Sequence, residues 1–165
     1  MKNRHFLIGI CVTIVVLLFA LILNIYYGGK LRAAKELNLR VQPTQKNEPF
    51  FVEIPYLESV DAFFQLGEDD FFLVEYKEYV GFVPKKYTCS VSKEIPKLAA
   101  VSGEINGETI LRVQPDEANY PYHMQLENGK AIMFYPIAIY TDDDYYLCIC
   151  DGMYGYVLCE YVQGN

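Results

Sequence analysis

Tryptophan is absent from this chain of 165 residues, and histidine occurs only twice. His5 precedes a long apolar run, so His123 is the only histidine after that run, and no serine or cysteine motif lies near it. Nucleophilic catalysis needs a nucleophile and a base within hydrogen-bonding reach, and no spacing of acidic residues marks a catalytic carboxylate pair. We therefore expect a protein that is not an enzyme and that uses no cofactor.

Basic residues are scarce in most of the chain. The sequence has 14 Lys and Arg against 21 Asp and Glu, a net charge of −7, yet five of the bases and none of the acids precede Glu36. From Glu36 onward, 21 acids face nine bases, a balance of −12. Such a charge repels phosphate backbones and anionic head groups. We expect neither a nucleic-acid ligand nor a lipid-surface ligand for this part of the chain.

A long apolar run stands near the start of the sequence. Its 22 residues, 6–27, carry no charge, and as a helix they would reach about 33 Å, enough to cross a bilayer. We expect a single-pass transmembrane helix over 6–27, between a short basic segment at 1–5 and a polar tether at 28–36. A cleaved signal peptide is the alternative, but no small-x-small cleavage site follows the run. Positive groups are equally numerous on its two sides, which leaves the orientation open.

Sustained helical periodicity with caps is missing after the tether, which predicts an all-β fold. The segment Leu39–Pro43 (LRVQP) returns 72 residues later as Leu111–Pro115, and Gly81 is matched by Gly155 at an offset of 74. Repetition at a nearly fixed spacing indicates a duplicated unit, with two residues added in the middle of the second copy. The predicted parts are two domains and the linker between them: 37–88, 107–162 and 89–106.

Apolar and polar residues alternate from Leu37 to Gln42, the period of a half-buried strand. In the second repeat, Asn128-Gly129 and Asp151-Gly152 are two-residue hairpin signals. Further strands of the first repeat, the last two forming a hairpin, are expected at 50–54, 60–66, 71–76 and 79–83.

Three motifs occur in the same order in both repeats: a Leu-Arg-x-x-Pro segment, an acid-rich turn before paired aromatics, and Gly-aromatic-Val followed by a tyrosine. In this combination the chain resembles the bacterial SH3-like domain, a small, partly open β-barrel of five to seven short strands. Val-Gln precedes the proline in both copies where that family usually has Ser-Gly. Phe71 and Tyr145 stand where the family commonly has a Trp that helps to form the ligand face. The expected fold class is all-β, with two tandem SH3-like barrels preceded by one transmembrane α-helix.

Cysteines and acidic residues suggest two kinds of metal site. On a strand, Cys148 and Cys150 would lie on one face about 6.6 Å apart, too far for a mutual disulfide, while either could pair with Cys159. The repeat aligns Cys148 with a core valine, Val74, so we expect the thiols to pack as small hydrophobes. The three acids at 142–144 do not have the spacing of a calcium loop. We expect no metal site.

Aromatic residues offer the most credible binding surface. The chain has 15 Tyr and 10 Phe, more than barrels of this size can bury, and exposed rings are suited to stacking on a peptide or a glycan. The candidate ligand-binding residues are Phe71, Tyr79, Phe82, Tyr145, Tyr154 and Tyr156.

The resemblance implies a function in binding. It predicts a non-catalytic protein of the cell membrane whose two domains, placed outside the cytoplasm by the anchor, bind cell-wall peptidoglycan or a protein segment. The alternative is a scaffold or regulatory subunit of a membrane protein complex, with the acidic barrels contacting a basic partner protein. A thiol-based sensor that uses the three cysteines of the second repeat is a third hypothesis. Ligand identity and oligomeric state stay open.

Overall fold

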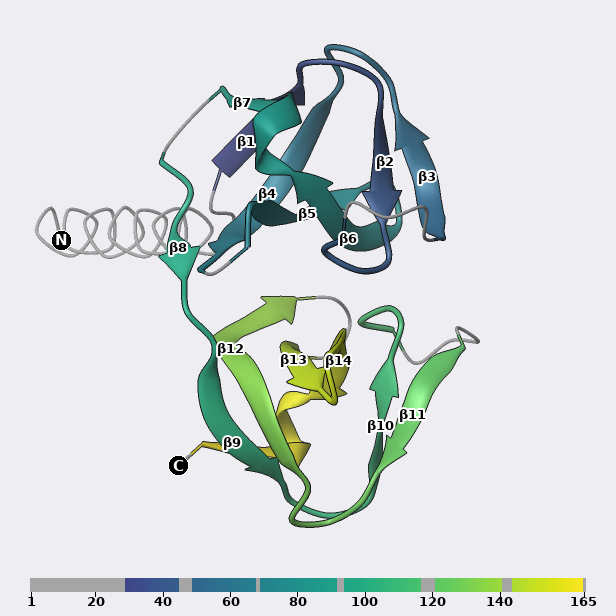
Figure 1. Cartoon of the computed structure of the whole chain (residues 1–165), viewed down its shortest axis with the longest axis vertical. Helices are drawn as coiled ribbons and strands as arrows, with labels where there is room; N and C mark the ends of the chain where they lie inside the picture. Colours follow the sequence, from purple (N-terminus) through teal and green to yellow (C-terminus); the bar gives the residue numbers. More distant parts are fainter. Residues whose placement is uncertain are drawn as a thin grey trace, which may run out of the picture.

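The computed structural model describes residues 29–44, 49–67, 69–91, 94–116, 121–140 and 144–164. These residues form β-strands and two single-turn 3-10 helices, and the strands belong to two sheets. The first sheet makes up the upper lobe in Figure 1 and the second sheet the lower lobe. The all-β part of the predicted fold class is confirmed.

The first domain, residues 29–90, is a sheet with the strand order β3-β2-β6-β5-β4-β1-β7. Neighbours along this path pair antiparallel. The short strand β8 (Lys97–Leu98) adds to β4 in parallel, just before the chain enters the second domain. The elements of the domain are β1 (Gly29–Ala33), β2 (Leu37–Arg40), β3 (Phe50–Ile54), β4 (Ser59–Leu66), β5 (Phe71–Tyr76), β6 (Tyr79–Pro84), the 3-10 helix η1 (Lys85–Tyr87) and β7 (Thr88–Ser90).

The second domain, residues 101–164, repeats this architecture. Its strand order is β11-β10-β14-β13-β12-β9-β15, the same as that of the first domain strand for strand. The repeated sequence is therefore matched by a repeated topology. The elements are β9 (Val101–Ile105), β10 (Thr109–Arg112), β11 (Tyr122–Leu126), β12 (Ala131–Tyr140), β13 (Asp144–Cys150), β14 (Met153–Leu158), the 3-10 helix η2 (Cys159–Tyr161) and β15 (Val162–Gly164).

The repeated glycines have a packing reason. A Cβ atom at Gly81 would lie 2.7 Å from the carbonyl oxygen of Arg40, and one at Gly155 would lie 2.7 Å from that of Arg112. Both distances are too short for a carbon atom beside a backbone oxygen. Glycine is therefore required where β6 crosses β2 and where β14 crosses β10.

The two added residues of the second repeat fall in two places. The register of β4 shifts between Ala62 and Phe64, and that of β12 shifts between Phe134 and Ala138. Gln65 and Ala138 face the equivalent residues Phe72 and Tyr146, so three steps along β4 from Ala62 correspond to four along β12 from Phe134. The second insertion lies in the connection from β12 to β13. One insertion is therefore accommodated inside a strand, as a wider bulge, and not only in a loop.

Each domain begins earlier than the sequence interpretation placed it. Residues 29–33, assigned to the tether, form β1, and residues 101–105, assigned to the linker, form β9. In β1 the side chains of Leu31 and Ala33 point into the core while Lys30 and Arg32 stay exposed. The short alternation was masked by its two basic residues, which made the segment look like a solvated connector.

The predicted fold class needs a correction at its first element. Among the described residues, no helix is long and apolar enough to span a membrane. The expected transmembrane helix, 6–27, and the basic segment, 1–5, lie outside the described residues. For the described residues, the fold that the structure supports is all-β, with two sheets.

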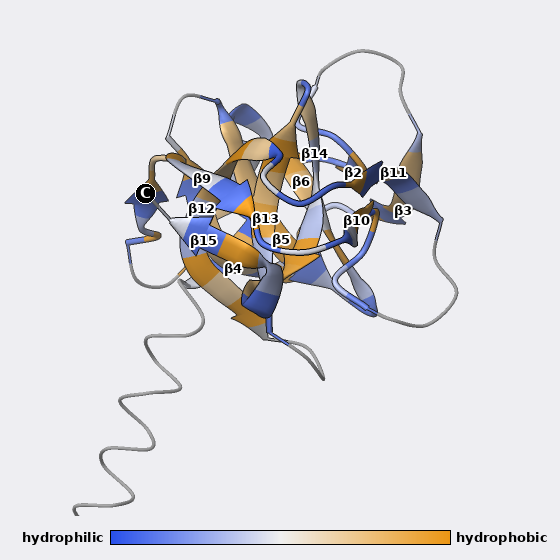
Figure 2. Cartoon of the chain, turned by 90° about the horizontal axis from the view of Figure 1, so that it is seen from below, coloured by the Kyte–Doolittle hydropathy of each residue, from blue (hydrophilic) through white to orange (hydrophobic). Residues whose placement is uncertain are grey.

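Three hydrophobic clusters hold the fold together. One lies within the first domain around Leu39 and Val74, and one lies within the second domain around Leu111 and Cys148. The third contains residues of both domains. Figure 2 shows hydrophobic colouring gathered around β4, β5 and β13, where the two domains overlap in that view. The two domains therefore share a hydrophobic core and do not move independently of one another.

Candidate binding site at the seam between the domains

We call the contact surface between the two domains the seam. In Figure 1, β5 and β6 of the upper lobe and β12 to β14 of the lower lobe border it. Its buried side chains come from equivalent strands of the two repeats, so the same face of each domain is turned toward the other. The seam cluster consists of Phe63, Phe64, Leu66, Phe71, Leu73, Val80, Phe82, Tyr135, Ile139, Tyr145, Leu147 and Tyr156.

Four of the six aromatic residues predicted to bind a ligand are buried in the seam: Phe71, Phe82, Tyr145 and Tyr156. They are not available as an exposed stacking surface, which corrects the prediction. The physical reason is the duplication itself, because each domain uses the other to cover the aromatic face that a lone barrel would expose.

The fifth candidate, Tyr154, packs at the border of the seam. Its ring lies edge-on to Phe82 with ring centroids 5.6 Å apart, and its hydroxyl donates a hydrogen bond to Oδ2 of Asp69 at 2.7 Å. Burial and this bond to Asp69 raise the pKa of the Tyr154 hydroxyl. Asp69, which belongs to the acid-rich turn of the first repeat, therefore helps to join the domains.

The sixth candidate, Tyr79, lies at the start of β6. Its ring stacks on Phe51 of the neighbouring β3, with centroids 5.4 Å apart and planes 7° apart. Both residues belong to the first domain. The structure thus separates Tyr79 from the buried four and does not gather the six candidates into one ligand face.

Glutamine side chains join the domains in a reciprocal manner. Gln42 of the first LRVQP segment donates from Nε2 to the Tyr154 carbonyl at 2.7 Å and accepts from the Tyr154 N–H at 2.9 Å. Gln114 of the second segment makes the same pair of bonds with Val80, at 2.7 Å to its carbonyl and 2.9 Å from its N–H. Each glutamine therefore mimics a strand partner for the backbone of the other domain.

Val80 and Tyr154 are equivalent positions. Tyr79 pairs with Tyr76 as Met153 pairs with Cys150, and each offset is 74 residues, which makes the following residues of β6 and β14 correspond as well. The seam thus has the character of an isologous interface, in which one patch meets its own copy. The Val-Gln that departs from the SH3-like pattern in both repeats was the sequence signal for this contact, since both glutamines serve the seam.

An open pocket of about 290 Å³ lies at one end of the seam. The first domain contributes the residues that follow β2, and the second domain contributes residues of β11, of the β13–β14 turn and of β14. The lining residues are Gln42, Pro43, Thr44, His123, Gly152, Met153 and Tyr154. These described lining residues carry no Asp, Glu, Lys or Arg, and they combine polar and apolar groups.

His123 is placed in the pocket by a β-bulge. Leu111 pairs with Met124 and Arg112 pairs with Tyr122, so His123 is the extra residue of β11 between two ladder pairs. Bulges commonly re-aim a side chain. Its Nε2 lies 3.3 Å from Nε2 of Gln42, and burial lowers the pKa of the imidazole below its ordinary value.

The cysteines of the second domain pack in its core or beside it. Cys148 and Cys150 are buried in the second domain's hydrophobic cluster, and for Cys148 this is the environment that its alignment with Val74 predicted. Burial raises the pKa of the Cys148 thiol, and burial together with Asp144 raises that of Cys159 to about 11. Thiols whose pKa is raised in this way are protonated at neutral pH and are poor nucleophiles. The described residues contain no cluster of His, Cys, Asp and Glu suited to a metal, and Asp142 and Asp143 lie outside them.

No protein-family model matches the chain, and no curated protein matches it either. Among solved structures, NlpC2 and NlpC1 from Trichomonas vaginalis are similar, each with 11% identity and a TM-score of 0.37. The matches cover 83% of this chain but only 48% and 46% of the two structures, so the chain spans about half their length. A likeness this distant carries no argument about function.

Proposed function

We propose that this chain is a non-catalytic binding protein of the SH3-like kind, in which the two domains act as one rigid unit. The observation that carries the proposal is the pocket at the seam, because both domains contribute to its wall and the wall exists only while they are joined. The shared hydrophobic cluster and the paired glutamine bonds support the rigidity.

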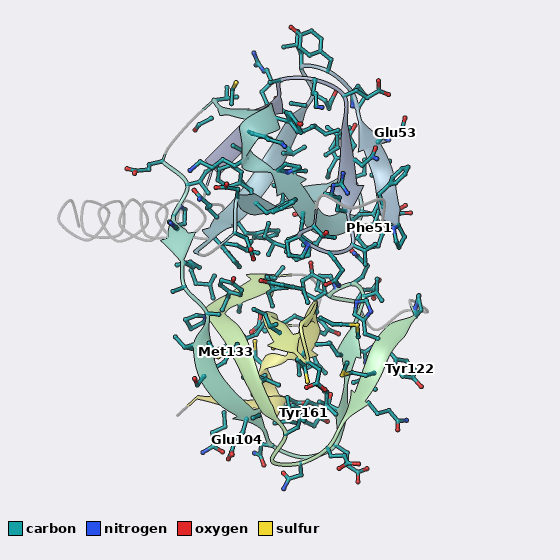
Figure 3. The ribbon with its side chains drawn as sticks, in the orientation of Figure 1. Phe51, Glu53, Glu104, Tyr122, Met133 and Tyr161 are labelled. Carbon is teal, nitrogen blue, oxygen red and sulfur yellow. The ribbon has the colours of Figure 1, made fainter. Side chains whose placement is uncertain are left out.

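The ligand in this proposal is cell-wall peptide or a protein segment outside the membrane. An extended peptide suits a site beside sheet edges: β3 and β11 each form one of the two edges of their sheet, and they lie on the same side of the molecule in Figures 1 and 2. Figure 3 shows Phe51 of β3 and Tyr122 of β11 on that side. Location at the cell membrane belongs to the proposal too, and it rests on the uncharged run at 6–27.

A second candidate function is that of a scaffold subunit for a basic partner protein. Two exposed aromatics favour it: Phe50 is 44% exposed and Tyr122 is 51% exposed. They occupy equivalent positions, since each pairs with the arginine of its LRVQP segment. Aromatic residues are enriched at protein interfaces, and the net charge of −7 favours a basic partner.

A sedimentation assay with purified bacterial cell walls separates the two functions. The full chain, kept in solution by mild detergent, is mixed with intact walls and with walls whose peptide stems have been removed enzymatically. Binding by peptide predicts that the protein sediments with intact walls and stays in solution with stripped walls. Equal sedimentation with both preparations, or none with either, contradicts the wall-peptide function. In the second case the scaffold function becomes the one to pursue, through crosslinking in cells.

A further inference from the structure

The two ends of the seam are built from equivalent residues but are filled differently. At one end His123 and Met153 stand beside Gln42. At the other end their equivalents, Phe51 and Tyr79, are two stacked rings. Gln114 at that end is only 2% exposed, whereas Gln42 is half-buried. The exchange of two large rings for an imidazole and a thioether therefore accompanies an opening at one end of an otherwise repeated interface.

The turn beside the pocket adds to this opening. Gly152 has a φ of +80°, and a Cβ added there would meet nothing within 4 Å. Its equivalent in the first repeat is Glu78, whose side chain is exposed. Glycine thus leaves the pocket's rim without a side chain where the other repeat has a charged one.

The hydrogen bonds around Gln42 fix the tautomer of His123. The amide oxygen of Gln42 accepts from the Tyr154 N–H, so Nε2 of Gln42 is the donating end of the amide. The histidine Nε2 that faces this donor at 3.3 Å must therefore be the acceptor. In the neutral imidazole the proton then lies on Nδ1. The bond to Gln42 is the one hydrogen bond that His123 makes with the described residues, which leaves the Nδ1–H to donate to an occupant.

Charge and size narrow the class of occupant. Among the described residues, no carboxylate or basic side chain lines the pocket, so the described part of its wall offers a charged group no specific partner. The acidic protein as a whole repels anions. A pocket of about 290 Å³ is at the small end of ligand sites, which suits a short stretch of peptide better than a large cofactor. Pro43 and Met153 offer apolar contacts beside the donor.

We infer that the seam pocket binds an uncharged segment of peptide, with a carbonyl oxygen of that segment accepting from the Nδ1–H of His123 and a small apolar side chain contacting Pro43 and Met153. The inference rests on the proposed function in that it takes the ligand to be a peptide. His123 is the specificity-determining residue, because its imidazole supplies a hydrogen-bond donor where its equivalent at the other end of the seam, Phe51, supplies none.

Nuclear magnetic resonance titration of the full chain with N-acetyl-trialanine amide, an uncharged blocked peptide, tests this site. We expect saturable shifts of the His123 ring resonances and of the Gly152 and Tyr154 amide resonances. The same peptide with a free carboxylate should bind more weakly. No saturable shift, or shifts confined to other parts of the chain, would overturn the inference.

Two substitutions at His123 make the test specific. His123→Phe installs the residue that the first repeat has at this position, so the fold accommodates it, and loss of one hydrogen bond should weaken peptide binding roughly three- to tenfold. His123→Gln keeps a donor and should restore most of the binding. Phe51→Leu, at the equivalent position of the first domain, is the control and should leave the affinity unchanged. Equal affinity of the wild-type protein and His123→Phe would overturn the assignment.

The wall assay and the peptide titration can refute the wall-binding function and the pocket inference independently of one another. If the peptide gives no saturable shift at His123 while the protein sediments with intact walls and not with stripped walls, the pocket inference is wrong and the wall-binding function stands. If the peptide binds at His123 but intact walls do not sediment the protein, the pocket inference stands and the ligand is a protein segment. Failure of both removes the peptide-binding account.

Discussion

The reciprocal glutamines allow a direct test of how the domains are joined, because the two side chains make the same bonds in different surroundings. Gln114→Ala removes both bonds from the Gln114 side chain to the Val80 backbone and leaves the Val80 carbonyl with the longer, 3.5 Å bond from the Tyr156 hydroxyl, and Gln42→Ala removes both bonds to the Tyr154 backbone. Gln114 is buried, whereas Gln42 lines an open pocket. Water can therefore replace the lost bonds at Tyr154 much more easily than at Val80.

The expected magnitudes follow from this difference. A buried polar group left without a partner costs about 1–3 kcal/mol. Gln114→Ala takes the glutamine from the Val80 N–H and leaves the Val80 carbonyl only weakly bonded by Tyr156, so it should lower the free energy of unfolding by about 2–4 kcal/mol. A hydrogen bond that water can replace contributes about 0.5–1.5 kcal/mol net, which gives about 1–2 kcal/mol for Gln42→Ala.

Urea unfolding of the full chain in mild detergent, followed by tyrosine fluorescence, measures both values against the wild-type protein. The midpoint for Gln114→Ala should be clearly the lower of the two, with an unchanged slope against urea concentration. An equal midpoint for the two variants, or a lower one for Gln42→Ala, would refute the argument from burial. A reduced slope for either variant would instead show that the domains unfold separately once a glutamine is lost.

Three further predictions concern other contacts. Because burial lowers the pKa of His123 in the folded protein, the unfolded chain takes up a proton at a higher pH than the folded protein does. The contribution of His123 to stability is therefore complete above about pH 6.5, the ordinary pKa of an imidazole, and is lost as the pH falls below it. The urea midpoints at pH 7.5 and 5.5 should differ more for the wild-type protein than for His123→Phe. Gly155→Ala should cost about 1–3 kcal/mol through overpacking, since the new Cβ would lie 2.7 Å from the Arg112 oxygen, and thermal unfolding measures this cost. Tyr154→Phe and Asp69→Ala should each destabilise the protein, and a double-mutant cycle should show that they act through one bond, with additivity contradicting it.

The sequence predicted the repeated all-β architecture because the information for it is local. The alternation at Leu37 and Leu39, and the hairpin signal Asp151-Gly152, correspond to β2 and to the turn between β13 and β14. The strand β1 was missed because Lys30 and Arg32 on its exposed face concealed the inward alternation of Leu31 and Ala33. A five-residue strand gives a pattern too short to outweigh its composition.

The candidate site could not be predicted in the same way, because it depends on how two copies face one another. Aromatics such as Phe71 and Tyr145 look like an exposed face when one barrel is considered alone, and they become core when the second barrel covers them. The glutamines carried a signal, since the same departure from the SH3-like pattern occurs in both repeats. His123 was noticed only as an isolated histidine, because its bulge and its neighbours from the other domain are not visible in the sequence.

Differential scanning calorimetry of the full chain tests the central claim, that the two repeats form one structural unit through the seam. The shared cluster and the four reciprocal glutamine bonds predict a single transition whose calorimetric and van't Hoff enthalpies agree. Two separate transitions in the wild-type protein, each with its own midpoint, would contradict the account and would leave the seam pocket without the joined domains that form it.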